Sequence, residues 1–402
     1  MKIKLPKDVE YIIATLNSSG HRADIVGGPV RDFLLGKIPD DYDITTSATP
    51  EEIKSAFSAH RTVDTGVKHG TVTLILNGKS YEITTYRIDG EYRDSRHPDS
   101  VSFTKDILLD LSRRDFTMNA IAYNSKDGIT DPHNGALDIE KQTIRTVGRA
   151  ELRFTEDALR IIRAVRFSST LGFGIEKQTQ EAISAHRGLL ANVSRERVYA
   201  EWKKLLLGKD AYSVLGRYLP VITEFLPELS NLSLPDRGLF DKADYLTRML
   251  SLFYLSTKNS PELYREAMRR LKTDSKTREV GAAVLSRVAE FDFSTDRAIA
   301  RALYRLGEET ARALIRLEIL LCHTDKACEE RLDAFLAGGS AYRISDLAID
   351  GSALLALGIS GREIGKTLDS LILGVIEGKY PNEKTALLRE VFELSKASRL
   401  TD

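Results

Sequence analysis

The chain has 402 residues, which is too long for one small hydrophobic core and predicts about two to four domains or subdomains. Hydrophobic residues make up 42% of the chain and charged residues 29%, a typical composition for a compact soluble protein, and no run is apolar enough to span a membrane. Lys and Arg balance Asp and Glu at 58 each, so any nucleic-acid surface must be a local basic patch.

The first residues lack the apolar core of a signal peptide, so we expect a cytoplasmic protein without membrane contact. Cys322 and Cys328 are the only cysteines. They are too few for a disulfide framework, and the intervening His323 does not complete a four-ligand zinc site. Nothing in the sequence indicates an obligate protein partner.

The first motif begins where residues 22–26 suit a strand that stops at Gly27 and Gly28. Pro29 fits the first position of a short helix, because its missing N–H would be unpaired there. Without a side chain at Gly28, an anion can approach the free N–H groups at the helix start. Arg31, one turn into the helix, adds a bidentate donor for a phosphate.

Asp41 and Asp43 follow in what the pattern predicts to be the next strand, where their i, i+2 spacing places both carboxylates on one face. Oxygen ligands beside a triphosphate suit Mg²⁺, and two such ions about 3.5–4 Å apart can activate a hydroxyl and stabilise a leaving pyrophosphate. Taken separately, the glycines are also compatible with an ordinary turn and the aspartates with an acidic strand edge. Together they predict phosphoryl or nucleotidyl transfer.

Residues 27–46 as a whole resemble the first motif of the class II nucleotidyltransferases. These enzymes build or repair the CCA end of transfer RNA and are related to the bacterial poly(A) polymerases. The resemblance implies that Asp41 and Asp43 are catalytic metal ligands and that Gly28 and Arg31 bind the nucleotide.

Residues 71–76 and 79–85 are rich in β-formers, and Asn77 with Gly78 between them predicts a type I′ hairpin. A mostly antiparallel sheet follows from this. A third metal carboxylate could come from Glu82 in the hairpin or from Asp115, and the sequence does not decide between them.

Residues 86–102 are polar, of mixed charge and without a clear period, which predicts a long mobile loop or, alternatively, a solvated insertion. In the resembled family, a loop at this position helps the enzyme move from adding C to adding A. Members that add only CC lack it, so its presence argues against a CC-only enzyme.

Residues 113–120 read Arg-Arg-Asp-Phe-Thr-Met-Asn-Ala and match the next motif of the family at every specified position. A second arginine converging on the pocket would offset the charge of a triphosphate and two acids. Arg114 is assigned to the nucleotide by its position in this motif. Without the match, a surface pair of arginines is the alternative.

Residues 156–167 resemble the Glu-Asp-x-x-Arg motif of the family and its arginine-rich continuation. Asp157 and Arg160 are expected on one helix face, as a structural ion pair or as a base-reading pair. Cytosine and adenine both present an amino donor beside a ring-nitrogen acceptor, which an Asp and an Arg can match; uracil and guanine would leave polar groups unpaired. Arg163 and Arg166 are expected to reach the triphosphate or brace the pair.

Residues 194–206 fit the last motif, a helix packed against the base-reading helix, where Arg197 and Glu201 are expected to give structural support. From there the spacing is helical, as over 242–255 and 299–321. Residues 264–272, with Lys276 and Arg278, form the most basic cluster, which predicts either contact with an RNA backbone or a solvated face.

Residues 347–382, in the last part of the chain, again resemble the family. The helix starts in this region contain glycine and could hold RNA phosphates. The predicted fold class is therefore α+β: a nucleotidyltransferase domain with a mostly antiparallel sheet and flanking helices, then an all-helical half. The predicted domains are a catalytic head (1–150), a base-recognising neck (151–210), an RNA-binding body (211–335) and an RNA-binding tail (336–402).

The predicted activity is Mg²⁺-dependent, template-independent addition of C and A from CTP and ATP to the 3′ end of tRNA. An enzyme that adds only the terminal A would share every motif. Poly(A) polymerase is disfavoured, because residues 64–71 lack the Gly-Arg-Arg-Phe run typical of those enzymes. A catalytically silent RNA-binding protein is the alternative from another class, although all four key acidic and base-reading residues are present.

Overall fold

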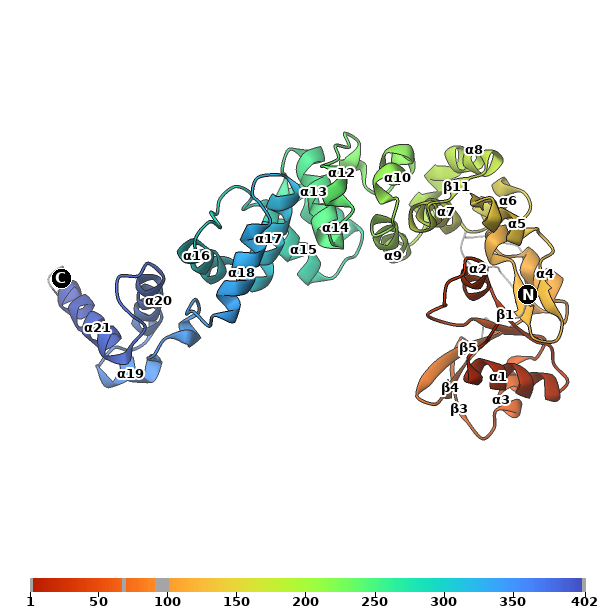
Figure 1. Ribbon diagram of the computed structural model, residues 1–402, viewed down its shortest axis with the longest axis horizontal. Coiled ribbons are helices and arrows are strands. Elements are labelled where there is room, and N and C mark those ends of the chain that lie inside the picture. The colour runs from red at the N-terminus through yellow and green to blue at the C-terminus, as the bar shows by residue number, and fades with distance from the viewer. Residues whose placement is uncertain (1–2, 67–69, 91–100, 400–402) are drawn as a thin grey trace. The chain divides into compact units, whose positions relative to one another are not determined.

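The computed structural model describes residues 3–66, 70–90 and 101–399 and forms two compact units, Met1–Pro227 and Glu228–Asp402 (Figure 1). The division falls inside the predicted body, and the finer four-part division stays a prediction. Among the described helices, none is both long and apolar enough to cross a membrane.

The N-terminal unit contains a seven-stranded sheet in the order β3-β4-β5-β2-β1-β8-β9. Only the β2–β5 pair is parallel, so the predicted mostly antiparallel sheet is confirmed. The strands are β1 (Ala23–Val26), β2 (Ile44–Thr46), β3 (Arg61–Gly66), β4 (Thr71–Leu76), β5 (Lys79–Thr85), β8 (Ala122–Asn124) and β9 (Gly128–Thr130).

The predicted hairpin joins β4 to β5, with Asn77 at φ 51° and Gly78 at φ 76°. Both positive angles are what a type I′ turn requires. Two short sheets complete the β-structure: β6 (Arg87–Asp89) pairs with β7 (Val101–Phe103), and β10 (Thr143–Ile144) pairs with β11 (Gly174–Ile175). The loop predicted over 86–102 therefore has strand-paired ends, while its centre, residues 91–100, lies outside the described residues.

The helices of this unit cover the sheet and then continue the chain beyond it. Helices α1 and α3 contact each other and the sheet (Figure 1), and α7 packs along α9. The elements are α1 (Lys7–Ser18), α2 (Gly28–Leu34), α3 (Pro50–Ala56), α4 (Ile107–Ser112), η2 (Thr117–Asn119), α5 (Gly135–Glu140), α6 (Ala150–Glu156), α7 (Leu159–Leu171), α8 (Lys177–His186), η3 (Arg187–Asn192), α9 (Arg195–Leu206), α10 (Ala211–Arg217) and α11 (Leu219–Ile222).

The described part of the C-terminal unit has helices only. Residues 299–321, which show continuous helical spacing, form two helices because Gly307, at φ 74°, ends α16. The short η4 (Pro227–Leu229) spans the boundary between the units. The other elements are α12 (Arg237–Phe240), α13 (Tyr245–Thr257), α14 (Pro261–Arg270), α15 (Ser275–Leu285), α16 (Asp296–Leu306), α17 (Glu308–Leu320), α18 (Ala327–Ala337), η5 (Ile344–Asp346), α19 (Gly351–Ala356), α20 (Arg362–Ile376) and α21 (Lys384–Arg399).

Candidate active site

The turn into α2 is the predicted phosphate site. Gly27 has φ 77°, and a Cβ there would lie 3.4 Å from Nη1 of Arg114, so the turn requires glycine for its backbone angle and brings it close to this arginine. In α2, Nε and Nη2 of Arg31 donate to Asp32 at 3.0 and 2.9 Å, and Nη1 donates to Oδ1 of Asn119 at 2.9 Å. The guanidinium is thus held next to Gly28 at the helix start.

The sequence pattern predicted that the two metal ligands lie on a strand, and this prediction is wrong. Strand β2 begins at Ile44, so Asp41 and Asp43 lie in the segment that leads into it. The ladder nevertheless extends to Asp43, whose carbonyl accepts a hydrogen bond from the N–H of Val26 at 3.1 Å. The neighbouring strand β1 therefore holds the backbone of Asp43.

The electrostatics of Asp43 fit a cation site. Although solvent reaches its carboxylate, surrounding protein atoms restrict hydration and raise the pKa of Asp43, and the charge of Asp41 raises it further. Arg114 opposes this shift, while Glu82 adds to it. Among the described residues, neither aspartate forms an ion pair, so both carboxylates are available to a cation.

Glu82 and Asp115, the two candidates for a third metal carboxylate, have different surroundings. Glu82 lines a cavity of about 560 Å³ together with Asp41 and Asp43. Asp115, in contrast, accepts hydrogen bonds from the N–H of Phe116 at 2.8 Å and from Nε of Arg163 at 2.9 Å. Within residues 3–66, 70–90 and 101–399, no three His, Cys, Asp or Glu side chains could hold a metal by themselves. A Mg²⁺ ion on the two aspartates would need further oxygens from water or phosphate, which is usual for this ion.

The arginine pair of the second motif is held by a buried acid. Asp110, in α4, accepts hydrogen bonds from Arg113 at 2.7 Å and Arg114 at 3.2 Å. Burial alone would raise the pKa of Asp110, but Arg114 and Arg113 hold it below its usual value. The sequence motifs did not identify Asp110 as a site residue. Its position in a helix, four residues before Arg114, is the pattern that could have indicated the ion pair.

The predicted base-reading pair is not on one helix face, which corrects the sequence interpretation. Helix α6 ends at Glu156 and α7 begins at Leu159, so Asp157 lies in extended backbone between them, at φ −140° and ψ 101°. Its Oδ1 accepts from the N–H of Leu159 at 3.1 Å. The carboxylate therefore holds the first N–H of the helix that carries Arg160.

Arg160 is only 8% exposed and is held by three acceptors. Nη1 donates to Glu156 at 2.6 Å and to the carbonyl of Arg153 at 3.2 Å, and Nη2 donates to the carbonyl of Arg113 at 3.0 Å. Since a guanidinium has five N–H donors, Nε and the second N–H of Nη2 are not used by these contacts.

Arg163 and Arg166, further along α7, are both bound by Glu201 of α9, at 3.3 and 2.8 Å. Arg166 also stacks on Phe167, with its Cζ 3.4 Å from the ring centroid. Because Arg163 is shared between Asp115 and Glu201, it joins the second motif to the last one. Because acidic side chains already hold both arginines, these contacts favour a role in bracing the neighbouring residues over direct binding of a nucleotide.

Three cavities that share lining residues bring several of the predicted residues together, although Gly28, Arg31 and Arg166 line none of them. The first, of about 260 Å³, is lined by Asp157, Arg160, Arg163 and Arg197 together with Arg113 and Arg114. The same two arginines line a second cavity of about 250 Å³, which Asp43 also lines. Asp43 in turn borders the third cavity, the one shared with Asp41 and Glu82. The predicted base-reading residues and the predicted metal ligands therefore line neighbouring cavities.

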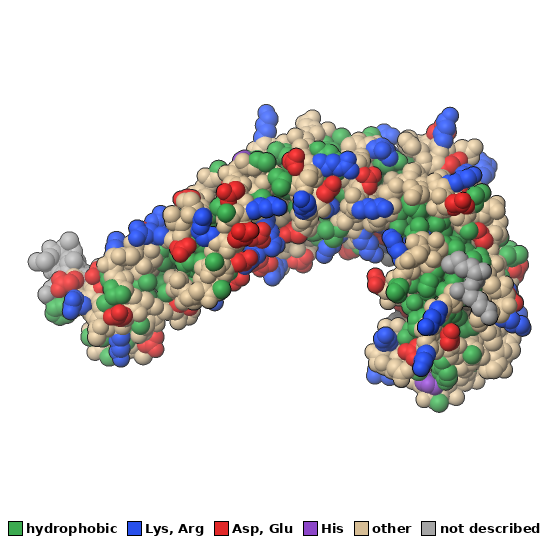
Figure 2. Space-filling model, viewed as in Figure 1, with side chains coloured by type: hydrophobic (Ala, Val, Ile, Leu, Met, Phe, Trp, Pro, Cys, Tyr) green, Lys and Arg blue, Asp and Glu red, His purple; other side chains and the backbone are tan. Residues whose placement is uncertain are grey.

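Three arginines of the basic cluster predicted in the C-terminal half form ion pairs, two of them with the same glutamate. Arg270 pairs with Glu228 at 2.7 Å, and Arg265 and Arg278 both pair with Glu279, at 3.2 and 3.0 Å. On the face shown in Figure 2, basic and acidic side chains are interspersed along this unit. The contacts favour a solvated face over a dedicated phosphate surface at this cluster.

Comparison with known proteins identifies the family of the chain. Residues 23–145 match the poly A polymerase head domain, residues 172–231 the probable RNA and SrmB-binding site of polymerase A, and residues 244–391 the putative tRNA nucleotidyltransferase domain 2. The CCA-adding enzyme of Geobacillus thermodenitrificans is 37% identical over 411 residues, covering 96% of each chain. The chain belongs to the CCA-adding enzyme family.

Other members of the CCA-adding enzyme family extend the comparison over the full length. The enzyme of Lactobacillus delbrueckii subsp. bulgaricus is 36% identical over 389 residues, covering 94% of this chain and 95% of the relative. A crystal structure of the Bacillus stearothermophilus CCA-adding enzyme in complex with CTP has a TM-score of 0.83 and 32% identity over 100% of both chains. The Thermotoga maritima CCA-adding enzyme with tRNA, at TM-score 0.65 and 22% identity, shows the fold alone.

Proposed function

We propose that this protein adds C and A to the 3′ end of tRNA from CTP and ATP, without a nucleic-acid template. The observation that carries the proposal is that Arg114 lines two cavities, one shared with Asp157 and Arg160 and the other with Asp43. A bound nucleotide is an extended molecule, and the two cavities offer a base-reading pair in one and a metal-type carboxylate in the other. The similarity to a CTP-bound enzyme over the whole chain supports it.

Base selection is proposed to come from Asp157 and Arg160. Each oxygen of Asp157 makes one hydrogen bond, to Leu159 or Arg197, and keeps a lone pair that can accept from an exocyclic amino group. The unused donors of Arg160 can meet a ring nitrogen. Uracil and guanine would place acceptor against acceptor and donor against donor, which costs about 1–3 kcal/mol for each unpaired buried group.

The triphosphate is proposed to lie against Gly28, Arg31 and Arg114. The free N–H groups at the start of α2 and the two guanidinium groups supply the positive charge that it needs. Arg163 and Arg166 belong to the nucleotide site as residues that brace it, because acidic partners already hold both.

Asp41 and Asp43 would hold the Mg²⁺ ions, whose chemistry is to activate the RNA 3′ hydroxyl and to stabilise the leaving pyrophosphate. The hydroxyl oxygen forms a new bond to the α-phosphorus, and the bond from that phosphorus to the pyrophosphate oxygen breaks. The arginines keep the pyrophosphate side of the nucleotide in place during this exchange. Since the substrates are tRNA and free nucleotides, the cytoplasm is the location we propose.

The deciding experiment is incorporation of each of the four labelled nucleotides into tRNA that lacks the whole CCA and into tRNA that ends in CC. We expect C on the first substrate, A on the second, and neither U nor G on either. Asp41→Ala should abolish incorporation and leave tRNA binding unchanged. Asp64→Ala, which changes an exposed residue of β3, is the control and should retain the activity of the parent.

Two results would change the conclusion. Failure to incorporate C, with A still added to tRNA that ends in CC, would identify an A-adding enzyme. An Asp41→Ala variant as active as the parent would end the metal proposal. Addition of long A runs would indicate poly(A) polymerase, which residues 64–71 and the names of the relatives compared above do not favour.

A further inference from the structure

The cavity lined by Asp41, Asp43 and Glu82 is not used by the nucleotide in the function proposed above. It has a volume of about 560 Å³, within the range of roughly 300–1,000 Å³ that small-ligand sites occupy. Its remaining lining residues come from the chain start, the segment before β2 and the β4–β5 hairpin: Pro6, Asp40, Tyr42, Gly78, Lys79, Ser80 and Tyr81. We call it the hairpin cavity.

The position of the hairpin cavity relative to the arginines limits what it can hold. Arg113 and Arg114 line the neighbouring cavity but not this one, and Asp43 borders both. In nucleotidyl transfer, the attacking oxygen and the leaving pyrophosphate lie roughly in line on opposite sides of the phosphorus. With the pyrophosphate beside the arginines, the attacking hydroxyl needs a different space next to Asp43, and the hairpin cavity is such a space.

The side chains of the hairpin cavity suit a terminal nucleotide. Tyr42 is half-buried, with its ring centroid 6.2 Å from that of Phe33, and can stack on a base. Lys79 is exposed and, among the described residues, forms no ion pair, so its charge can meet a phosphodiester. Carboxylates beside them accept hydrogen bonds from ribose hydroxyls.

Tyr81 supports the cavity wall instead of contacting a base. It is 7% exposed, and its hydroxyl donates to Asp8 of α1 at 3.0 Å. Asn77, in the hairpin turn, donates to the same carboxylate at 2.9 Å. Helix α1 thereby holds the hairpin, so Lys79 projects from a fixed turn.

We propose that the hairpin cavity receives the 3′-terminal nucleotide of the acceptor RNA, with Tyr42 against its base and Lys79 against its phosphodiester. This inference rests on the proposed function, because it takes the arginine side as the place of the pyrophosphate. It assigns a substrate subsite to Tyr42 and Lys79, to which the function proposed above gives no role.

A cross-linking experiment tests the location directly. tRNA lacking CCA, with 4-thiouridine as its last nucleotide, is bound to the full-length protein without divalent cations and irradiated. The expected cross-links fall within residues 40–43 or 78–82. Cross-links confined to other segments would overturn the proposal. tRNA with 4-thiouridine inside the acceptor stem is the control for non-specific labelling.

Substitutions test the two contacts by kinetics. Lys79→Glu should lower kcat/KM for tRNA roughly tenfold, because it replaces attraction to a phosphodiester with repulsion, while KM for CTP stays the same. Lys126→Glu makes the same charge change in the β8–β9 turn and should match the parent. Tyr42→Leu should also lower kcat/KM for tRNA roughly tenfold, whereas Tyr42→Phe keeps a stacking ring and should retain it.

The two proposals fail in different ways. If the parent protein adds neither C nor A, the proposed function is wrong and this inference falls with it. If the parent adds both, while Lys79→Glu and Tyr42→Leu match their controls, only the assignment of the hairpin cavity is wrong.

Discussion

Arg197 of α9 donates a hydrogen bond to Oδ2 of Asp157 at 2.9 Å, across 40 positions of sequence. The other oxygen of Asp157 accepts from the N–H of Leu159, the first residue of α7, so both carboxylate oxygens are held. A residue assigned only structural support from the sequence thus contacts the proposed base-reading acid directly. We infer that Arg197 positions Asp157 for base selection.

Replacing Arg197 should relax this selection. In Arg197→Met, Asp157 loses the partner that orients it, and we expect kcat/KM for CTP to fall by about tenfold to a hundredfold, equivalent to roughly 1.4–2.8 kcal/mol. The ratio of C to U incorporation should fall as well, measured on tRNA lacking CCA. Arg197→Lys retains the charge and should keep part of the selectivity. An unchanged ratio in Arg197→Met would argue that the ion pair serves only stability.

Removal of divalent cations should separate catalysis from RNA binding. A chelator is expected to stop incorporation and leave tRNA binding unchanged, and added Mg²⁺ should restore activity. Direct Mn²⁺ titration followed by electron paramagnetic resonance gives a readout independent of activity. Asp43→Asn should weaken this Mn²⁺ binding, whereas the exposed Asp64→Asn should not. Equal Mn²⁺ affinity in both variants would exclude Asp43 as a ligand.

Asp110 should make a pH-dependent contribution to stability. In Asp110→Asn, Arg113 and Arg114 lose their buried acidic partner, and we expect the free energy of unfolding near neutral pH to fall by roughly 3 kcal/mol. The pKa of Asp110 is lowered in the folded state, so its stabilisation is present above the unfolded value of about 3.9 and is lost as the pH falls through the folded value.

Denaturant unfolding as a function of pH measures this effect. The difference between parent and Asp110→Asn should stay constant from about pH 7 to about pH 5 and shrink below about pH 4. Asp64→Asn is the control variant, because Asp64 is exposed and pairs with Lys54 at 2.8 Å. An exposed ion pair of this kind contributes less than about 1 kcal/mol to the free energy of unfolding. A difference that grows on acidification would contradict the assigned direction.

Replacing Glu201 should lower stability and should reduce activity with CTP and with ATP to the same extent. Glu201→Gln removes the charge shared by Arg163 and Arg166, and we expect the free energy of unfolding to fall by about 1–3 kcal/mol. Since the brace does not touch the base, kcat/KM for CTP and for ATP should fall in parallel. Lys204→Gln, on the exposed side of the same helix, is the control. A drop for one nucleotide alone would indicate a direct role in base reading.

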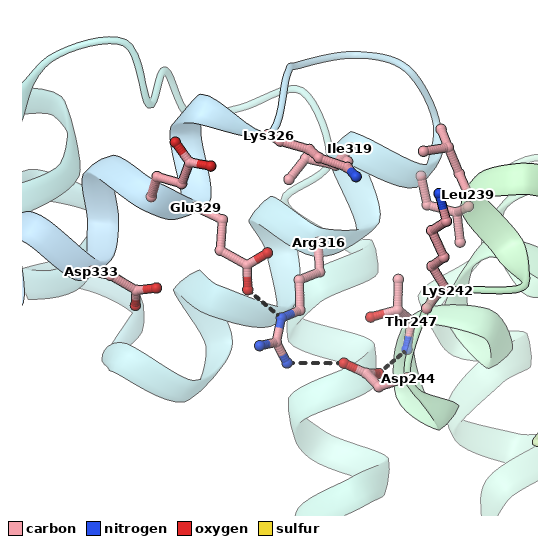
Figure 3. A pocket seen from close by; sticks show the side chains of 12 residues that line it. Leu239, Lys242, Asp244, Thr247, Arg316, Ile319, Lys326, Glu329 and Asp333 are labelled. Carbon is pink, nitrogen blue, oxygen red and sulfur yellow. Dashed lines mark hydrogen bonds and ion pairs between the residues drawn. The ribbon is translucent and has the colours of Figure 1, made fainter.

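Arg316 links three helices of the C-terminal unit around a separate cavity of about 520 Å³ (Figure 3). From α17 it donates to Glu329 of α18 at 2.6 Å and to Asp244, the N-cap of α13, at 3.0 Å. Arg316→Met should lower stability by about 1 kcal/mol, since the pair is partly exposed, and should speed hydrogen exchange in α18. Lys326→Met, which lines the same cavity, should leave the exchange rates of α18 unchanged.

The sequence by itself determined the elements that depend on local backbone chemistry. Asn77 and Gly78 specify their hairpin because both adopt positive φ angles that few other residues tolerate. Gly27 marks the turn into α2 for a similar reason. The motif segments could likewise be assigned to a family, because each is a short contiguous pattern.

Only the tertiary structure decided which charged groups meet. Asp157 lies between two helices instead of on one, and Asp115 is bound by Arg163, 48 positions away. The order of the cavities also depends on how the sheet and α7 pack. The reason is physical: an ionic contact depends on distances of a few ångströms between segments remote in sequence, and no local pattern encodes those distances.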